Sequence, residues 1–198
     1  MSEPTPRSSS APTYDHAYFE QLYARDADPW SVLTSTYERE KFLTTVNALT
    51  KPMYDHALEL GCSIGGLTRY LVPRCRALTA VDTSATAIRQ ARERCPQAHV
   101  TFVQGHLPDV DVAGPFDLVV LSEVLYYFTV PALARLGEWL AHVAAPNAEA
   151  VVVHWTGETD YPLSGDRAME LFQSLMRARV RLRVLRPRYR LELWTLGP

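Results

Sequence analysis

A glycine-rich segment, and an acidic residue that follows it about twenty positions later, suggest the clearest chemistry in this 198-residue chain. The segment runs from Glu59 to Leu67 with the sequence E-L-G-C-S-I-G-G-L, between an apolar run and a helical pattern. Small residues in such a turn let the backbone approach a ligand closely, and the helix that follows offers free N–H groups. Asp82 comes twenty-one residues after Gly61 and ends the next apolar run. A carboxylate there can accept both hydroxyls of an adenosine ribose.

Two other ligand classes compete for the same segment. A dinucleotide site prefers G-x-G-x-x-G, but Ser63 takes the place of the middle glycine and the third glycine is one place early. The stretch 61–65 also matches the esterase pattern G-x-S-x-G, with Asp117 and His154 following in a possible triad order. Only one strand precedes it and no HGG-type run is present, which argues against an esterase. A turn that binds nothing would leave the two acidic residues at the strand ends unexplained.

The elements that must position these residues alternate between strand and helix from residue 56 onward. The strands are expected at residues 56–60, 77–81, 100–103, 116–121 and 150–153, with helices between them. The run 116–121 is almost continuously apolar, as in parallel strands covered on both faces. We therefore predict an α/β fold with a Rossmann-like, doubly wound sheet. Alternating runs at 180–184 and 189–193 predict a strand pair that closes the sheet edge.

The N-terminal part of the chain has a different composition. Residues 1–13 are rich in Pro, Ser and Thr and predict a disordered tail. Asp15 can cap a first helix, and Ser35 with Glu38 has the spacing of a capping box that opens a second. We expect a single domain over residues 14–198, in which residues 14–50 form a helical lid and residues 56–198 form the Rossmann-like core.

The overall composition restricts the class of protein. Hydrophobic residues make up 47% of the chain and charged residues 21%, with a formal net charge of -2. This balance is typical of a soluble domain and does not favour nucleic acid as a partner. No apolar run reaches the roughly 18 residues that span a bilayer. Three cysteines without CxxC spacing favour the cytoplasm, and no His or Cys pair has metal-ligand spacing, so we predict no metal site.

The glycine segment and Asp82 resemble motifs I and II of the class I S-adenosylmethionine-dependent methyltransferases. Further stretches resemble, more narrowly, the NodS-like family of N-methyltransferases. They are Y-F-E-Q-L-Y at 18–23, D-P-W at 28–30, S-T-Y-E-R-E-K at 35–41, G-C-S at 61–63, L-S-E-V-L-Y-Y at 121–127 and H-W-T-G at 154–157.

This resemblance implies a seven-stranded sheet, S-adenosylmethionine as the methyl donor and transfer to nitrogen. The acceptor of the family's type member is the amine of a deacetylated chitin oligosaccharide. Three positions depart from the general pattern. Ser63 replaces a glycine, His106 stands where an Asp often contacts the adenine amine, and Pro146-Asn147-Ala148 replaces a Pro-Gly-Gly turn.

Ligands of open α/β sheets bind beyond the carboxyl ends of the strands. Residues that follow the strands are therefore expected on one rim. The predicted cofactor-binding residues are Glu59, Gly61, Cys62, Ser63, Gly65, Asp82, Thr83, Gly105, His106, Leu107 and Ser122.

Glu123 and His154 are the candidate catalytic residues. An alkylammonium acceptor must lose a proton before it can attack a methyl group, and a carboxylate or imidazole can accept that proton. Glu123 could also anchor the amine, or simply cap a short helix. His154 could instead bond only to backbone. The candidate substrate-binding residues are aromatic, suited either to cation–π contact or to core packing. They are Tyr18, Trp30, Tyr37, Tyr126, Tyr127 and Trp155.

Seven arginines between residues 177 and 190 crowd the C-terminal part. They could bind RNA, or they could form the solvated face of an edge hairpin, which their alternation with apolar residues favours. The sequence thus predicts an N-methyltransferase that acts on a small-molecule amine, as a monomer or homodimer without nucleic acid or membrane. The alternatives are an O- or RNA-directed methyltransferase and a non-catalytic nucleotide-binding module.

Overall fold

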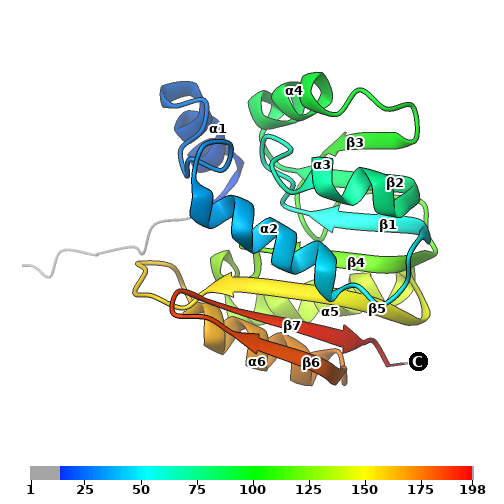
Figure 1. Ribbon diagram of the computed structural model, residues 1–198. Helices are drawn as coiled ribbons and strands as arrows, with labels where there is room; N and C mark the ends of the chain where they lie inside the picture. Colours follow the sequence, from blue (N-terminus) through cyan, green and yellow to red (C-terminus); the bar gives the residue numbers. More distant parts are fainter. Residues whose placement is uncertain (1–13, 198) are drawn as a thin grey trace, which may run out of the picture.

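The computed structural model describes residues 14–197, so the predicted disordered tail lies outside the described residues. A seven-stranded sheet forms its centre (Figure 1). The strands are β1 Tyr54–Leu60, β2 Cys75–Asp82, β3 Val100–Gln104, β4 Phe116–Ser122, β5 Ala144–Trp155, β6 Arg179–Leu185 and β7 Tyr189–Thr195. Their order is β3-β2-β1-β4-β5-β7-β6, with β7 antiparallel to both neighbours and the other pairs parallel. The predicted doubly wound sheet with an antiparallel edge hairpin is confirmed.

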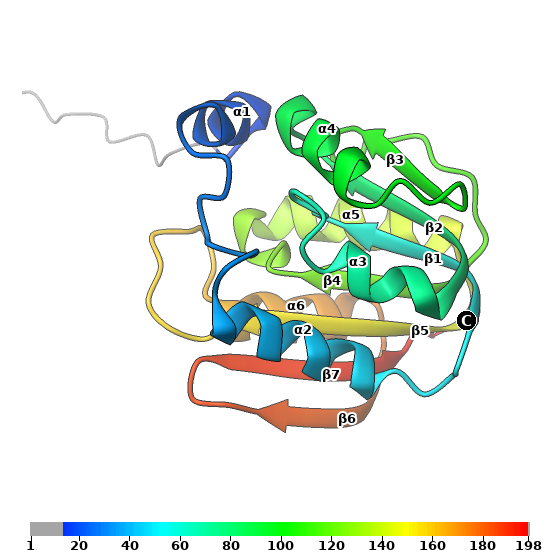
Figure 2. The same ribbon diagram turned by 45° about the horizontal axis from the view of Figure 1, so that its top comes forward.

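Helices cover both faces of this sheet (Figure 2). They are α1 His16–Arg25, α2 Thr36–Ala48, α3 Thr68–Leu71, α4 Ala85–Arg94, α5 Val130–Val143 and α6 Gly165–Leu175, with short 3-10 helices η1 Val72–Arg74 and η2 Leu125–Tyr127. Side chains of α2, α3 and α4 pack on one face, and side chains of α5 and α6 pack on the other. Within residues 14–197, no helix combines the length and the apolar character needed to cross a membrane.

Alternation along the central strands explains why they are apolar throughout. In β4, Leu118 and Val120 pack with the cluster under α2 and α3, whereas Val119 and Leu121 pack with the cluster under α5 and α6. All four side chains are fully buried. Successive side chains of a strand point to opposite faces, so covering both faces requires apolar residues at every position.

Four of the helix starts follow from polar residues that cap them. Asp15, Ser35, Ser84 and Ser164 each accept the backbone N–H three residues later, at the starts of α1, α2, α4 and α6. The predicted capping box at Ser35 is only half formed. The Glu38 carboxylate accepts a hydrogen bond from Lys41 instead of returning to the Ser35 backbone N–H. Glu38, expected to complete the cap, therefore pairs with the Lys41 side chain.

The two N-terminal helices differ in how they pack. Phe42 and Val46 of α2 are buried against the sheet, so α2 is a layer of the core. Tyr23 is the buried residue of α1, which packs beside α4 (Figure 2). That residues 14–50 act as a lid stays a prediction, and α1, which is not a layer of the core, suits that role better than α2.

Candidate active site

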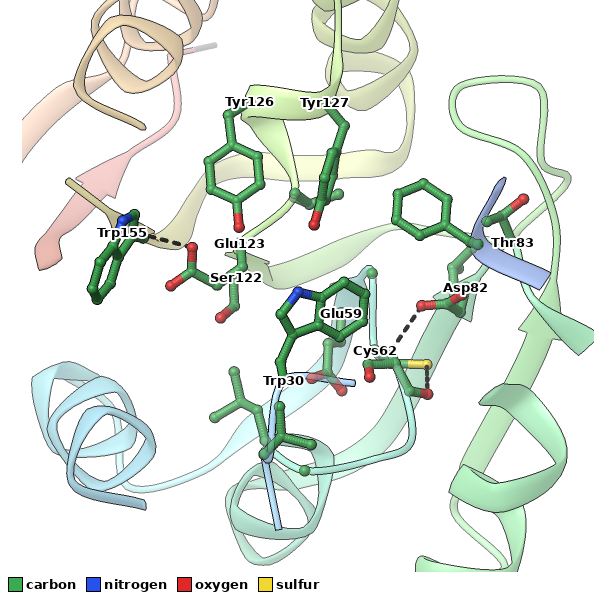
Figure 3. Close-up of a pocket in the computed structure, with 18 of the residues that line it drawn as sticks. Trp30, Glu59, Cys62, Asp82, Thr83, Ser122, Glu123, Tyr126, Tyr127 and Trp155 are labelled. Atoms are coloured by element: carbon green, nitrogen blue, oxygen red, sulfur yellow. Dashed lines mark hydrogen bonds between the residues drawn. The ribbon is translucent and has the colours of Figure 1, made fainter. Parts of the chain in front are cut away.

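A cavity of about 450 Å³ opens at the carboxyl ends of the parallel strands (Figure 3). It lies where the strand order reverses between β1 and β4, the position expected for ligands of this sheet type. Sixteen of the nineteen predicted site residues line it. They are Glu59, Gly61, Cys62, Ser63, Asp82, Thr83, Gly105, His106, Leu107, Ser122, Glu123, Trp30, Tyr37, Tyr126, Tyr127 and Trp155. Gly65, Tyr18 and His154 are the three that do not.

The glycine segment forms a tight turn between β1 and α3. The backbone N–H groups of Gly61 and Cys62 both donate to the Val81 carbonyl at 2.9 Å, so they join the turn to β2 and do not face the cavity. Gly61 and Ser63 have φ angles of 76° and 53°. A left-handed conformation favours glycine, which explains why the general motif has a glycine at the position of Ser63. The Ser63 hydroxyl accepts a hydrogen bond from Tyr23 of α1 at 2.6 Å.

Gly65 has a structural role in place of the predicted contact with a cofactor. Its φ angle is 82°, and a Cβ atom at this position would lie 3.2 Å from the Cα atom of Ala91 in α4. It does not line the cavity. The glycine therefore allows α4 to approach the turn closely.

Asp82 is held rigidly at the end of β2. Its Oδ2 atom accepts the Ser63 backbone N–H at 2.8 Å, and its Oδ1 atom accepts the Ser84 backbone N–H at 2.9 Å. Burial raises the pKa of the Asp82 carboxyl, although these N–H groups act in the opposite direction. Each carboxylate oxygen keeps a further lone pair, so both can still accept a hydroxyl from the cavity.

Glu59, at the start of the glycine segment, is the second carboxyl group at this end of the cavity. It is only 2% exposed, and burial raises its pKa to about 8. Its Oε2 atom has no hydrogen-bond partner among the described residues. A buried carboxylate oxygen without a hydrogen-bond partner is destabilising, and a bound ammonium group would satisfy it. The cavity thus fits a ligand that brings a positive charge to Glu59.

Glu123 is part of a buried ion-pair cluster that was not expected. Lys41 of α2 lies 2.6 Å from Glu123 Oε1 and 2.9 Å from Glu38 Oε1, and it is 2% exposed. The second oxygen of Glu123 accepts the Trp155 backbone N–H at 2.9 Å (Figure 3). Burial favours a higher pKa for Glu123, but the charge of Lys41 and these hydrogen bonds outweigh it and lower the pKa. Glu123 is thus held as an anion, which suits an anchor for an amine better than a proton acceptor.

Lys41 and Glu38 also line the cavity and were missed by the sequence analysis. One sequence feature could have indicated Lys41. The chain contains 18 arginines but only two lysines, Lys41 and Lys51. A lysine retained in such a chain suits a place where a compact ammonium group fits and a guanidinium does not.

His154 does not reach the cavity, which corrects its prediction as a catalytic residue. It is fully buried, and its Nε2 atom accepts the backbone N–H groups of Val124 and Leu125 at 3.2 and 2.9 Å. Burial lowers its pKa to about 4. It therefore acts through the backbone, holding the start of η2, and the lone pair that would accept a proton is already in use.

The same geometry excludes the esterase alternative. Asp117, the proposed acid of the triad, accepts the backbone N–H of His56 at 2.9 Å near the amino end of β1. Ser63 follows the carboxyl end of that strand. The three residues of the hypothetical triad are therefore not assembled.

Aromatic side chains form one wall of the cavity. Tyr126 and Tyr127 pack against Tyr161, with ring centroids 4.8 and 4.6 Å apart. Tyr161 was not predicted as a site residue. On α1 the prediction chose the wrong side of the helix, since Phe19 and Tyr23 line the cavity and Tyr18 does not.

Two further predicted residues lie at the cavity with roles that no contact settles. Trp30 is 37% exposed and lines the cavity (Figure 3). Its ring meets that of Tyr23 edge-on, with centroids 5.7 Å apart. The imidazole of His106 lies 3.2 Å from the hydroxyl of Thr83. The predicted contact between His106 and adenine stays a prediction. Within residues 14–197, no group of three His, Cys, Asp or Glu side chains could hold a metal ion.

The strand order with its antiparallel β7, the glycine turn and the cavity at the carboxyl ends of the strands define a class I S-adenosylmethionine-dependent methyltransferase fold. Within that class, the family model for Nodulation protein S (NodS) matches residues 15–138. The chain belongs to the NodS family.

Known proteins resemble the chain in sequence and in fold. Nodulation protein S of Sinorhizobium fredii is 30% identical over 139 residues, which are 69% of this chain and 63% of that protein. The N-methyltransferase NodS of Bradyrhizobium japonicum WM9, solved with S-adenosyl-L-homocysteine, superposes with a TM-score of 0.81 at 22% identity, covering 92% of this chain and 98% of that one. A putative methyltransferase of Pseudomonas syringae superposes with a TM-score of 0.72 at 30% identity, covering 81% of this chain and 99% of that one. The chain spans about half to just under two thirds of the length of the curated nodulation proteins it matches.

Proposed function

We propose that the protein is an S-adenosylmethionine-dependent N-methyltransferase that acts on an amine of a small molecule. One observation carries the proposal. Among residues 14–197, four carboxyl groups, those of Glu38, Glu59, Asp82 and Glu123, line the cavity beside a single ammonium group, that of Lys41. Glu59, whose pKa burial raises to about 8, loses its proton when a cation binds beside it. Such a cavity attracts cations, and both a sulfonium donor and an amine acceptor bring positive charge.

The donor end of the cavity is formed by the glycine turn, Glu59 and Asp82. When bound there, S-adenosylmethionine would supply a methyl group activated by a positive sulfur. Asp82 would accept the ribose hydroxyls with the lone pairs that face the cavity. Glu59 would accept the donor's ammonium group with the oxygen that has no partner.

The acceptor end is formed by Glu123 and the aromatic wall. Glu123 keeps its negative charge because Lys41 lies 2.6 Å away, so it can accept an N–H of an acceptor that enters as the free amine, its proton having been lost to solvent. When the methyl group moves from sulfur to nitrogen, the positive charge moves with it, and Glu123 stabilises the ammonium that forms. Tyr126, Tyr127 and Trp155 add aromatic faces, each contributing about 0.5–2 kcal/mol toward a bound cation. Alignment of the nitrogen for in-line displacement can supply on the order of 7–11 kcal/mol of the barrier.

An RNA acceptor is less well supported. Carboxylates along the cavity would repel phosphates, and two arginines of the C-terminal hairpin already have carboxylate partners. Arg183 and Arg190 lie 2.5 and 2.7 Å from Glu192.

Calorimetry tests the donor assignment. We expect the protein to bind S-adenosylmethionine and S-adenosylhomocysteine but not NAD, and Asp82→Ala to abolish this binding. Asp109→Ala is the matched control, because Asp109 is an exposed partner of Arg135. Thermal unfolding establishes that both variants are folded. No heat with either adenosine ligand would remove the proposal.

A panel of matched amines and alcohols tests the acceptor. Release of S-adenosylhomocysteine with amines and not with the corresponding alcohols supports methylation of nitrogen. Turnover of the alcohols alone would assign the protein to the O-directed alternative.

A further inference from the structure

A second cavity, of about 480 Å³, lies between α2 and the turn that joins β6 to β7. Its polar walls are Tyr37, Glu40, Thr44 and Asn47 on α2, and Arg186 and Arg188 on the turn. No step of the proposed reaction uses it.

Tyr37 lines both cavities. Its ring lies 5.9 Å from that of Trp155, which lines the active cavity, and 6.1 Å from that of Tyr189, which lines the second one. Tyr37 is therefore the side chain that stands between the two cavities, and a ligand that passes it would occupy both.

The turn that carries the arginines is fixed against the active cavity by its backbone. The Arg188 carbonyl accepts the Thr156 backbone N–H at 3.1 Å, and Thr156 directly follows Trp155. The Arg188 guanidinium lies over the Tyr37 ring, 5.7 Å from its centroid. Its position is thus defined while its N–H groups stay accessible to a ligand.

The two cavities carry opposite charge. Arg186 and Arg188 have no carboxylate within 4.0 Å among residues 14–197, unlike Arg183 and Arg190 of the same hairpin. In the second cavity two guanidinium groups face one carboxylate, that of Glu40. In the active cavity the carboxylates of Glu38, Asp82 and Glu123 already outnumber the one ammonium group, that of Lys41.

We propose that the second cavity binds an anionic group at the far end of the acceptor, with Arg188 and Arg186 as its ligands. The inference rests on the proposed function, since it assumes that the amine lies in the active cavity. The acceptor class is then an amine whose other end carries a carboxylate or a phosphate. Guanidinium groups bind both anions through pairs of parallel hydrogen bonds.

Primary amines that share one linker series and end in hydroxyl, carboxylate or phosphate test this proposal. We expect a higher kcat/KM for an anionic series than for the hydroxyl series, with carboxylate and phosphate compared at each length. Arg188→Ala should raise KM for the anionic amines by about tenfold, the size of one lost charged hydrogen bond. The hydroxyl amines should change far less, through the contact of Arg188 with Tyr37 alone. Arg181→Ala is the control, because Arg181 is exposed on the same hairpin and lines neither cavity.

Calorimetric titration of the phosphate-ended amine into the S-adenosylhomocysteine complex gives a readout that does not depend on turnover. Weaker binding to Arg188→Ala than to Arg181→Ala supports the second cavity. Equal kcat/KM for all three series, or equal effects of the two variants, would overturn it. Failure of S-adenosylhomocysteine itself to bind would instead overturn the proposed function, so the two failures are distinguishable.

Discussion

The ammonium group of Lys41 lies 2.6 Å from Oε1 of Glu123, a residue 82 positions further along the chain. The contact joins α2 to the residue that follows β4 at the acceptor end of the cavity. Lys41 also contacts Glu38 and is 2% exposed, so two carboxylates share one buried positive charge. The pKa of Lys41 is raised because these carboxylates outweigh the effect of burial.

Replacement Lys41→Met tests how much of the fold depends on this cluster. Methionine fills a similar volume but leaves Glu38 and Glu123 without their counter-charge. Removal of one partner from a buried ion pair costs about 3–5 kcal/mol, and we expect that loss in the free energy of unfolding at pH 7. Without Lys41 the pKa of Glu123 should rise, so the loss should be smaller at pH 5 than at pH 8.

Lys51→Met is the matched control. Lys51 pairs with Asp117 at 3.1 Å, but its side chain is half exposed, and such pairs contribute about 0–1 kcal/mol. Urea unfolding of both variants gives the comparison. If both variants lose the same free energy of unfolding, the buried Lys41 cluster stabilises the fold no more than the exposed Lys51 pair.

His154 should make the stability of the protein depend on pH. Its pKa is lowered from 6.5 to about 4 by burial, so between these values the unfolded chain binds a proton that the folded protein does not. Stability should therefore fall as the pH drops through this window, by about 3 kcal/mol in total. His154→Gln keeps an oxygen that can accept a backbone N–H but does not titrate, so this part of the pH dependence should disappear.

Urea unfolding between pH 7 and pH 4.5 measures the effect. His99→Gln is expected to keep the wild-type dependence, because His99 is exposed. If the free energy of unfolding of His154→Gln depends on pH as strongly as that of the wild type, His154 is not the group responsible.

The sequence sufficed to place the donor end of the site because local rules determine it. Parallel strands end at one edge of the sheet, so the residues after β1, β2, β3 and β4 had to meet there. The glycine turn, Asp82 and Ser122 all line the cavity for this reason. Gly65 was the exception. A glycine can be required by a positive φ angle and close packing against α4, or by contact with a ligand, and the sequence does not distinguish these two causes.

The acceptor end depends on tertiary contacts that no local pattern contains. The burial of Lys41 follows from Glu123, far away in the sequence, while the sequence around it is strongly polar. His154 and Trp155 are the last two residues of β5, and a strand directs neighbouring side chains to opposite faces. Because β5 is apolar on both faces of the sheet, its sequence does not indicate which of the two side chains lines the cavity. On α1 several aromatic residues made the rotation of the helix ambiguous, which explains the choice of Tyr18 over Phe19.

Gly65→Ala separates helix packing from ligand contact. An alanine would carry a Cβ atom 3.2 Å from Ala91 at a φ angle of 82°, and we expect about 1–3 kcal/mol of destabilisation. Binding of S-adenosylhomocysteine by the folded variant should change less than about threefold, a difference of under 1 kcal/mol. Gly197→Ala is the control, since its nearest neighbour would be 3.5 Å away. A large loss of affinity at unchanged stability would restore the predicted contact between Gly65 and cofactor.

The predicted lid can be tested on α1 without disturbing the core. Glu20 accepts hydrogen bonds from the hydroxyls of Ser84 and Thr86 at 2.7 and 2.5 Å, and the Tyr23 hydroxyl donates to Ser63 at 2.6 Å. These contacts attach α1 to the glycine turn and to the start of α4, on either side of Asp82.

The double variant Glu20→Ala/Tyr23→Phe should therefore loosen α1 while α2 and the sheet keep their packing. The three lost hydrogen bonds contribute about 1 kcal/mol each, so S-adenosylhomocysteine should dissociate on the order of a hundred times faster. Stopped-flow displacement measures this rate, and Arg25→Ala, an exposed change at the end of the same helix, should leave it unaltered. If α1 is only a structural cap, the double variant will unfold more easily but release the ligand at the wild-type rate. A faster release at a temperature where both proteins are fully folded assigns α1 to the closing of the site, because α1 then retards escape of the ligand.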